Sequence, residues 1–330
     1  MKPKVYLTRV IANEVMQRLQ EATELKFWAE DRPVPREVLL KEAADCVGVL
    51  AMLTERIDAE FLDACPQLRV VSNHAVGFDN VDVAACTERG ILAGNTPDVL
   101  TETTADLAFA LIMATARRVH EMVEYVKQDK WRTWGPLDNL GMDVHHATLG
   151  IMGMGRIGYA VAKRAKGFDM ELIYHDRFQS SIAEEKLGVK FVSREELLKR
   201  SDFITLHVPL TPETRHSVGK AEFEQMKASA ILINTSRGPV VNQEALLNAL
   251  KSGQIRGAGL DVTDPEPMRA DNPLLELPQV TILPHIGSAT LETRTKMADV
   301  AARNLVSGLL GEEMVSCLNP QARSSGRNKS

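Results

Sequence analysis

The sequence is poor in aromatic residues and cysteine, has no excess of basic residues and contains no long apolar run. Its 330 residues include 39 Lys and Arg against 44 Asp and Glu, so the formal net charge is −5. A nucleic-acid-binding face needs an excess of basic residues, and we therefore expect no nucleic-acid partner. A membrane-spanning helix needs roughly 20 mostly apolar residues, and no stretch approaches that length, so we expect no membrane partner.

Cysteine is scarce, and none of the four residues lies in a Cys-x-x-Cys spacing. No group of Cys, His and Asp residues has the spacing of a metal site, so we expect no metal. The cysteines indicate reduced thiols of a cytoplasmic protein, and the first residues lack the apolar core of a signal peptide. The four are Cys46, Cys65, Cys86 and Cys317.

The sequence does contain a regular alternation of strand-like and helix-like segments. In the first hundred residues, short apolar runs alternate with amphipathic segments. This alternation predicts a parallel sheet covered by helices, and a chain of this length is expected to form two domains. The expected strands are residues 4–8, 47–52 and 68–72, and the expected helices are residues 12–22, 35–44, 57–64 and 81–89.

Residues 149–158 combine an apolar run with the pattern Gly-x-Gly-x-x-Gly. In a strand–turn–helix unit, Gly153 permits the tight turn, Gly155 lets a pyrophosphate approach the backbone, and Gly158 lets helix and strand pack closely. The pyrophosphate sits at the helix N-terminus, where an anion is favoured. Asp176 follows another strand-like run, 23 residues after Gly153, where a carboxylate can bind a ribose diol. The sequence therefore predicts a dinucleotide-binding domain.

The rest of the chain extends this second domain. Six strand-like runs that alternate with helices predict a doubly wound sheet. A helix over residues 101–119 is apolar on nearly every side, which is typical of a buried helix between domains, and a long final helix is expected over 289–310. The polar end, residues 319–330, is expected to be a disordered tail. The six expected strands are residues 148–152, 171–175, 203–207, 230–234, 257–260 and 280–283.

Three motifs follow strands of the second domain. They are Asn-Thr-Ser-Arg-Gly at 234–238, Asp-Val-Thr-Asp-Pro-Glu-Pro at 261–267 and Leu-Pro-His-Ile-Gly-Ser at 283–288. Together with the glycine fingerprint, these motifs resemble those of the D-isomer-specific 2-hydroxyacid dehydrogenases, and the resemblance covers almost the whole chain. The stretches 75–80 and 95–101 are most similar to the glyoxylate/hydroxypyruvate reductase branch.

The resemblance implies an α/β fold with two doubly wound parallel-sheet domains, in which a Rossmann cofactor domain is inserted into a flavodoxin-like substrate domain. The substrate domain would comprise residues 1–98 and 287–318, and the NAD-binding domain residues 99–286. The final helix would then return to the first domain. The resemblance also implies a homodimer.

Three residues at strand ends have side chains suited to reducing a 2-oxo acid. Arg237 has the planar cation that fits a carboxylate, His285 is the natural proton donor, and Glu266 can accept a hydrogen bond from its other ring nitrogen. Each residue alone could be a strand-end or turn residue without a catalytic role. Their joint position after strands, downstream of a dinucleotide motif, favours catalysis. His74 and His207 also follow strands and could line the site.

The first domain and one irregular segment supply the expected substrate contacts. Val76 and Gly77 follow a strand of the first domain. Their backbone N–H groups could bind the substrate carboxylate from the side opposite Arg237. The resemblance implies that Leu53 lies beside the substrate and that Trp134 reaches the partner subunit's active site. The alternatives are core packing for Leu53 and a loop anchor for Trp134.

The cofactor expected is NAD, with NADH preferred and NADP possible. Asp176 favours NAD because a carboxylate repels a 2′-phosphate, although the neighbouring Arg177 can bind that phosphate. Beyond these two residues and the three glycines, the resemblance implies a wider set of cofactor contacts. These are Thr104, Arg156, Ile157, Val208, Pro209, Thr214, Thr235, Ser236, Arg237, Asp261, His285, Gly287 and Ser288.

These features together predict an NAD(P)H-dependent reductase of a small 2-oxo acid, glyoxylate or hydroxypyruvate. One alternative is an enzyme like phosphite dehydrogenase, which residues 58–71 also resemble. That enzyme has a lysine before its Gly-Phe-Asp-Asn run, where this chain has Val76. Another alternative is an NAD-sensing module like the C-terminal-binding corepressors, which carry long tails that this chain lacks.

Overall fold

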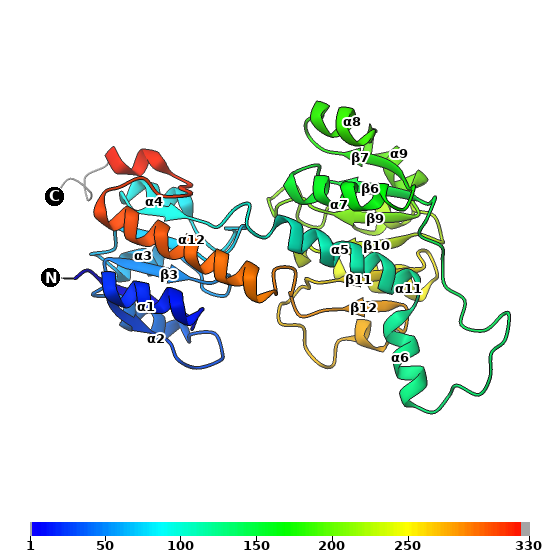
Figure 1. The fold of residues 1–330 in the computed structure, drawn as a ribbon, viewed down its shortest axis with the longest axis horizontal. Coiled ribbons are helices and arrows are strands. Elements are labelled where there is room, and N and C mark those ends of the chain that lie inside the picture. The colour runs from blue at the N-terminus through cyan, green and yellow to red at the C-terminus, as the bar shows by residue number, and fades with distance from the viewer. Residues whose placement is uncertain (1, 325–330) are drawn as a thin grey trace. The chain divides into compact units, whose positions relative to one another are not determined.

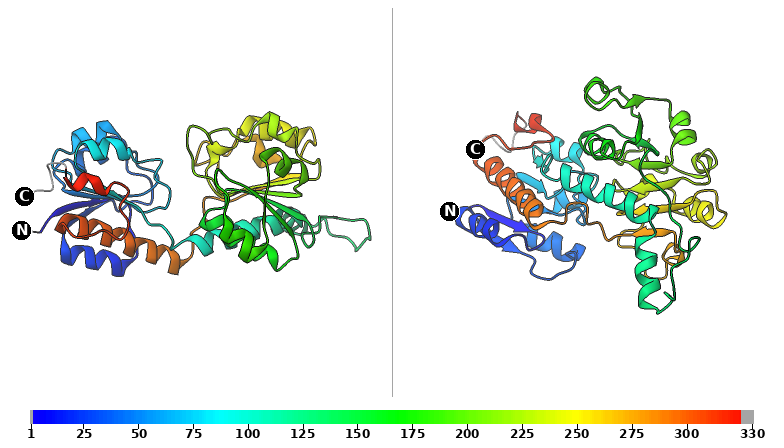
Figure 2. Two further views of the ribbon diagram at one scale, coloured as in Figure 1. Left: turned by 90° about the horizontal axis from the view of Figure 1, so that it is seen from above. Right: turned by 45° about the vertical axis from the view of Figure 1, so that its right-hand side comes forward.

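The structure is a computed structural model, and it describes residues 2–324. The chain divides into two compact units, residues 1–100 with 288–330 (unit 1) and residues 101–287 (unit 2). Unit 2 is therefore inserted between two parts of unit 1, and each unit has its own layers of helices around a sheet (Figures 1 and 2). The sequence placed the two junctions between these units at residues 98–99 and 286–287.

The described part of unit 1 contains a five-stranded parallel sheet in the flavodoxin-like order β2-β1-β3-β4-β5. Successive residues of a strand point to opposite faces, so Val5 packs with α1 and α12, whereas Tyr6 packs with α2, α3 and α4. The long final helix thus belongs to unit 1, as expected. The strands are β1 (Lys4–Leu7), β2 (Glu24–Phe27), β3 (Gly48–Ala51), β4 (Val70–Asn73) and β5 (Leu92–Gly94). The helices are α1 (Asn13–Ala22), α2 (Arg36–Ala43), α3 (Ala59–Ala64), α4 (Val83–Glu88) and α12 (Leu291–Leu310).

Unit 2, all of whose residues are described, has a seven-stranded parallel sheet in the order β12-β11-β10-β9-β6-β7-β8. Strand order reverses between β6 and β9, which is the Rossmann arrangement predicted. On β10, Ile231 and Ile233 pack on the face covered by α5, α7 and α8, whereas Leu232 packs on the face covered by α9, α10 and α11. The strands are β6 (Thr148–Met152), β7 (Glu171–His175), β8 (Lys190–Phe191), β9 (Phe203–Leu206), β10 (Ile231–Asn234), β11 (Gly257–Leu260) and β12 (Val280–Ile282). The helices are α5 (Thr101–Ala116), α6 (Val119–Lys127), α7 (Arg156–Lys166), α8 (Ser181–Leu187), α9 (Arg194–Arg200), α10 (Lys220–Phe223) and α11 (Gln243–Lys251).

The helix expected over residues 101–119 is shorter and less apolar than predicted. It ends at Ala116 because Arg118 adopts a left-handed conformation with φ 56°, and α6 begins at the next residue. One side of α5 is polar, since Asp106 on that side pairs with Arg164 of α7 at 2.6 Å. The apolar composition of α5 therefore did not reveal that one side of the helix faces solvent.

The chain after α5 leaves the body of unit 2. In Figure 1, α6 and the following irregular segment extend away from the sheet before the chain returns to β6. This segment, residues 128–147, exposes large apolar side chains that a folded chain normally buries. Their exposed fractions are 64% for Trp131, 82% for Trp134, 82% for Leu137 and 56% for Leu140.

The expectation of a disordered tail from residue 319 is wrong for residues 319–324. Pro320–Ser324 form a 3₁₀ helix, and Asn319 and Ala322 are buried. The Asn319 side chain accepts a hydrogen bond from the Ala93 N–H and donates one to the Ile91 carbonyl, both at the edge of the unit 1 sheet. Residues 325–330 of the predicted tail lie outside the described residues.

Candidate active site and cofactor-binding site

The turn between β6 and α7 holds the glycine fingerprint. Gly153 has a φ of +96°, and a Cβ there would lie 2.7 Å from the His207 carbonyl oxygen, so both conformation and space require glycine. A Cβ at Gly158 would lie 2.1 Å from the Gly153 carbonyl oxygen. At Gly155, a Cβ would meet no described atom within 4 Å. Gly155 thus leaves open space at the N-terminus of the 11-residue helix α7, where an anion is favoured.

Asp176 follows β7 and is tied to the glycine turn. Its Oδ2 accepts the Met154 N–H at 2.7 Å, and its Oδ1 accepts the Arg177 N–H at 2.6 Å. Each carboxylate oxygen retains capacity for another donor. Arg177 is exposed, and the pKa of Glu213 is lowered by hydrogen bonding to Thr211 and, to a smaller extent, by the charge of Arg177. Two carboxylates therefore lie near the Arg177 cation: Asp176 in the loop after β7 and Glu213 in the loop after β9.

The loop after β9 contains Val208 and Pro209. The Pro209 carbonyl oxygen accepts the Thr214 hydroxyl at 2.6 Å, and the Thr214 Oγ1 accepts the Thr211 N–H at 2.7 Å. Thr214 therefore closes this loop on itself. The structure gives it a local structural role beside the cofactor role that the sequence suggested.

The loop after β10 is held by Asn234, a residue to which sequence reasoning assigned no role. Its Oδ1 accepts the Ser236 N–H at 3.0 Å, and its Nδ2 donates to the Arg237 carbonyl at 2.9 Å. Between them, Thr235 is only 8% exposed, and its hydroxyl has no hydrogen-bond partner within residues 2–324. An unpaired buried hydroxyl is unfavourable, so this group is a candidate contact for a ligand in the loop.

His285 and Glu266 lie together beyond β12 and β11. The Nδ1 atom of His285 is 2.5 Å from Oε1 of Glu266, and the side chains are 29% and 40% exposed. This hydrogen bond takes one ring nitrogen and leaves Nε2 for a substrate. The pairing is the one expected from the sequence.

Asp261 fixes the backbone on which His285 is carried. It is 2% exposed, and its two carboxylate oxygens accept the N–H groups of Ile286 and Gly287 at 2.7 and 2.8 Å. Burial raises the pKa of Asp261, whereas these N–H groups and the nearby His285 act in the opposite direction. On the other side, the Thr104 hydroxyl donates to the Gly287 carbonyl at 3.2 Å. Asp261 and Thr104 therefore orient the 285–287 loop.

Arg237 is half-buried in the loop after β10, and its Nη1 donates to the Ser236 carbonyl at 2.9 Å. At the next residue, a Cβ on Gly238 would lie 1.8 Å from the Thr263 carbonyl oxygen. The loop that carries Arg237 therefore packs directly against the loop that leads to Glu266. Because all strands of the sheet are parallel, these loops lie at one edge, where α/β proteins bind ligands.

In unit 1, the expected substrate residues lie in loops after neighbouring strands. Leu53 is half-buried and follows β3, and Val76 and Gly77 are half-buried and follow β4, which pairs with β3 through Ala51 and Asn73. The partial exposure of Leu53 argues against simple core packing. Ser288 also belongs to unit 1, whereas the other expected cofactor residues belong to unit 2.

The two other candidate histidines, His74 and His207, are half-buried. Burial lowers the pKa of His74 to about 4 and that of His207 to about 3. Nδ1 of His74 contacts the Met52 sulfur at 3.2 Å, and Nε2 of His207 contacts the Thr205 hydroxyl at 2.9 Å. Both side chains are therefore neutral near pH 7, and neither can serve there as a proton-loaded acid.

Other features of the described residues do not add to the site. A cavity of about 190 Å³ near Thr115, Arg118 and Arg256 lies where β10–β12 begin, at the opposite edge of the sheet. Residues 2–324 contain no cluster of three possible metal ligands, and no helix among them is long and apolar enough to span a membrane.

Comparison with known proteins identifies the family. Residues 109–287 match the family model described as D-isomer specific 2-hydroxyacid dehydrogenase, NAD binding domain. A glyoxylate reductase from Korarchaeum cryptofilum is 51% identical over 313 residues, which cover 94% of each chain. A glyoxylate/hydroxypyruvate reductase B from Klebsiella pneumoniae is 46% identical over 325 residues, covering 98% of this chain and all of that one.

Solved structures agree with this assignment. A Thermus thermophilus protein has a TM-score of 0.90 and 45% identity, with 96% of this chain and 99% of that chain covered. An NADPH-dependent glyoxylate/hydroxypyruvate reductase from Sinorhizobium meliloti, in complex with NADP and malonate, has a TM-score of 0.84 and 30% identity, with 98% of each chain covered. The chain therefore belongs to the D-isomer-specific 2-hydroxyacid dehydrogenases.

Proposed function

We propose that this chain reduces glyoxylate or hydroxypyruvate to the corresponding 2-hydroxy acid, with a reduced nicotinamide dinucleotide as cofactor. The observation that carries this proposal is the His285–Glu266 pair, 2.5 Å apart, in the same unit as Arg237 and a complete glycine fingerprint. The names of the relatives support the choice of substrates.

The residues of unit 2 fit the dinucleotide. Gly155 leaves space for a pyrophosphate at the start of α7, and Asp176 has acceptor capacity for a ribose diol. The orphan hydroxyl of Thr235 lies one residue beyond the end of β10, in the loop that carries Arg237. The cofactor residues expected from the sequence would bind the dinucleotide along these loops. When bound, it supplies the hydride.

The protein's own groups would complete the reaction. Arg237 would bind the substrate carboxylate through its planar cation, and the N–H groups of Val76 and Gly77 would bind carboxylate oxygens too. As the carbonyl carbon accepts a hydride, its oxygen takes a proton from Nε2 of His285. Glu266 would hold the ring in place through its hydrogen bond with Nδ1.

A steady-state panel tests the function. The purified protein is assayed with glyoxylate, hydroxypyruvate, pyruvate and phosphite, each with both cofactors. We expect kcat/KM to be highest for glyoxylate or hydroxypyruvate. A higher value for phosphite with NAD would replace the proposal with the phosphite dehydrogenase alternative, and cofactor binding without turnover of any substrate would favour the sensing module.

The Glu266–His285 pair predicts a loss of rate when the charged acceptor is removed. Glu266→Gln keeps an acceptor at Nδ1 of His285 but loses the charge that strengthens this hydrogen bond, so the ring is held less firmly. We expect kcat for reduction to fall by up to about 10²-fold, because misplacing a reacting group can cost that much. Steady-state kinetics at saturating NADH check this. An unchanged kcat would show that Glu266 does not orient the ring.

We propose a preference for NADH over NADPH, because Asp176 would lie beside the 2′-phosphate of NADPH. Asp176→Ser removes that repulsion and leaves Arg177 to bind the phosphate. The ratio of kcat/KM for NADPH over NADH should rise at least about tenfold, equivalent to roughly 1.4 kcal/mol. The rise should shrink in high salt because Arg177 is exposed. Asp143→Ser, at an exposed acid of the same unit, is the control and should leave the ratio unchanged. A wild-type enzyme that prefers NADPH would contradict the preference.

We also propose a homodimer in which the segment 128–147 contacts a second copy and Trp134 reaches its site. The supporting observation is that four large apolar side chains within ten residues, Trp131, Trp134, Leu137 and Leu140, are exposed. Light scattering after size exclusion should give the mass of two chains. A monomer at micromolar concentration would overturn this proposal.

The proposed location is the cytoplasm, whose reducing conditions keep thiols free. All four cysteines are free in the structure, and burial raises the pKa of Cys46 to about 11 and the pKa values of Cys65 and Cys86 to about 12. Cell fractionation with an antibody against the chain would test the location.

A further inference from the structure

The loop between β4 and the turn at Asn80 presents two consecutive backbone N–H groups. Within residues 2–324, neither the Val76 N–H nor the Gly77 N–H is taken by a hydrogen-bond acceptor. The carbonyl oxygens of the same two residues are both occupied: Val76 accepts from Asn95 at 2.8 Å, and Gly77 accepts from Asn73 at 2.9 Å. Two adjacent N–H groups without an acceptor are available to bind an anion.

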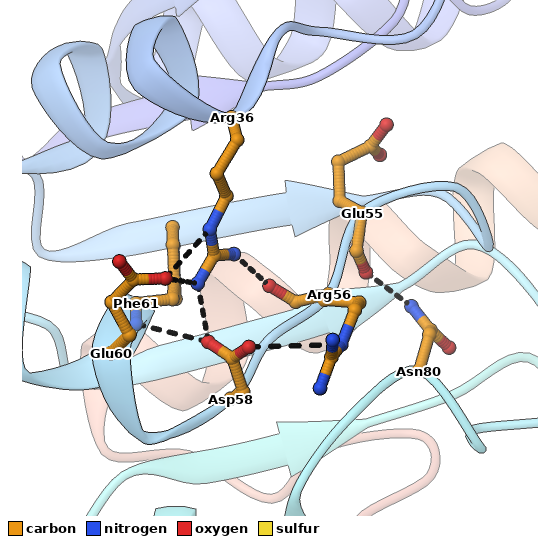
Figure 3. A network of polar contacts seen from close by, with 7 residues as sticks. All are labelled: Arg36, Glu55, Arg56, Asp58, Glu60, Phe61 and Asn80. Carbon is orange, nitrogen blue, oxygen red and sulfur yellow. Dashed lines mark hydrogen bonds and ion pairs between the residues drawn. The ribbon is translucent and has the colours of Figure 1, made fainter.

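Asn73 and Asn80 connect this loop to the neighbouring one. Asn73 is fully buried at the end of β4, and its second N–H donates to Oδ1 of Asn80 at 3.2 Å. The two N–H bonds of Asn80 donate to the carbonyls of Met52 and Glu55, at 3.0 and 2.9 Å. All four amide hydrogens of this pair are therefore used, and they join the loop of Gly77 to the loop that carries Leu53 (Figure 3 shows the Asn80–Glu55 bond).

Asn95 holds the other carbonyl from β5. It is 6% exposed, and its Oδ1 accepts the Ser316 hydroxyl at 2.6 Å, so its Nδ2 is directed at the Val76 carbonyl. The Asn95 backbone carbonyl accepts from Asn304 of α12 at 2.8 Å. The orientation of the Asn95 side-chain amide is thus set by Ser316 at its oxygen and by the Val76 carbonyl at its nitrogen. Ser316 and Asn304 come from the C-terminal part of the chain, which fixes Asn95 within unit 1.

We propose that Asn73, Asn80 and Asn95 are positioning residues that hold the 74–79 loop so that the Val76 and Gly77 N–H groups bind the substrate carboxylate. The Val76 carbonyl belongs to the same peptide as the Gly77 N–H and is held by the Asn95 amide, and the Gly77 carbonyl, one peptide further on, is held by the Asn73 amide. These two peptides therefore cannot rotate to present oxygen to an anion. This inference rests on the proposed function, because it assigns the loop a carboxylate ligand. It predicts that these asparagines affect substrate binding and leave cofactor binding, which belongs to unit 2, unchanged.

Isosteric substitutions test the proposal. Asn73→Asp and Asn95→Asp replace a donor with an oxygen that faces the carbonyl of Gly77 or Val76. We expect KM for glyoxylate to rise at least about tenfold, kcat to change less, and the Kd of NADH to stay within about twofold. Asn80→Ser, which shortens the side chain and breaks the link to the Leu53 loop, should raise KM as well.

The chain offers two matched controls in unit 1. Asn319→Asp alters an equally buried asparagine whose amide bonds go to Thr87, Ile91 and Ala93, and to neither substrate loop. Arg36→Ala removes a side chain that binds Glu60 and the Arg56 carbonyl beyond Leu53 (Figure 3). Both should lower stability in urea without raising KM. If the Asn73 and Asn95 variants lose stability with unchanged KM, or if the controls raise KM equally, the proposal is overturned.

A spectroscopic readout separates this inference from the function on which it rests. In ¹⁵N-labelled wild-type protein with NAD, glyoxylate should shift the amide resonances of Val76 and Gly77. In Asn95→Asp the shifts should require at least about tenfold more glyoxylate. Equal titrations in both proteins would overturn the positioning role alone. Wild-type amides that do not respond, in an enzyme that still reduces glyoxylate, would overturn the carboxylate subsite while leaving the reductase proposal intact.

Discussion

His285→Ala should lower kcat for the reduction of glyoxylate by roughly 10²- to 10⁴-fold, because general-acid catalysis contributes about that much. Converted to free energy, this is about 2.7–5.5 kcal/mol of transition-state stabilisation. The geometry supports a loss of this size, since His285 is held by Glu266 on one ring nitrogen and by Asp261 through the backbone of its loop. Stopped-flow reduction under saturating NADH measures the effect on the chemical step.

The control for this variant is His120→Ala, which removes a histidine that contacts Thr281 at the opposite edge of the unit 2 sheet. It should leave kcat unchanged, and both variants should bind NADH like the wild type. A near-normal kcat for His285→Ala from pH 6 to 8 would show that another group donates the proton.

The second large effect separates two glycines of one fingerprint. Gly158→Ala should destabilise unit 2 by about 3 kcal/mol, because its Cβ would lie 2.1 Å from the Gly153 carbonyl oxygen and the backbone must move. Gly155→Ala meets no described atom within 4 Å, and its φ of −74° suits alanine, so the free energy of unfolding should stay within about 0.5 kcal/mol. Urea unfolding followed by circular dichroism measures both.

The affinity for NADH should rank the two folded variants in the opposite order, with Gly155→Ala more impaired than Gly158→Ala. Gly155→Ala places a methyl group where a pyrophosphate would approach the start of α7, and we expect the Kd of NADH to rise at least about tenfold. Titration of NADH fluorescence at low temperature measures this. A stable Gly155→Ala protein with unchanged NADH affinity would contradict the proposed course of the cofactor along this turn.

The sequence predicted most of the architecture because both sheets are buried on two faces. Runs such as residues 230–233 are continuously apolar, which is typical of a parallel strand buried on both faces. The strands missed are those at sheet edges or with little burial. β2 is exposed or half-buried throughout, β8 has two exposed residues, and β5 has only three residues, one of them glycine. Such segments become strands because they pair with a neighbouring strand, and the sequence pattern of the segment itself does not show that partner.

The candidate catalytic residues could be named from the sequence because the chemistry proposed for them depends on residue type. A guanidinium, an imidazole and a carboxylate after successive strands point to an oxo acid whichever conformation the loops adopt. The asparagines that orient these loops were not predictable in the same way. Asn73, Asn80, Asn95 and Asn234 act through amide hydrogens directed at backbone carbonyls, and their partners include residues more than 200 positions away, as for Asn95 and Ser316. A polar residue that ends a buried strand is the one signal the sequence offered.

The predicted tail shows the same limit. Residues 319–324 look polar and dispensable, but Asn319 is buried against β5 because its amide completes hydrogen bonds at the sheet edge. Composition alone assigns such a segment to solvent. Only the topology, which returns the chain to unit 1 after residue 287, places a sheet edge beside it.

This return of the chain has a consequence for how the protein is made. During synthesis, residues 1–100 emerge first, but the face of their sheet covered by α12 stays bare until residues 291–310 leave the ribosome. Val5, Leu50 and Val70 are then exposed to solvent while some 190 further residues are translated, roughly 10–40 s at 5–20 residues per second. Unit 2 is contiguous and can fold during that interval. The nascent N-terminal part is therefore the segment for which we expect chaperone binding, and the cofactor unit should acquire its structure before the substrate unit does.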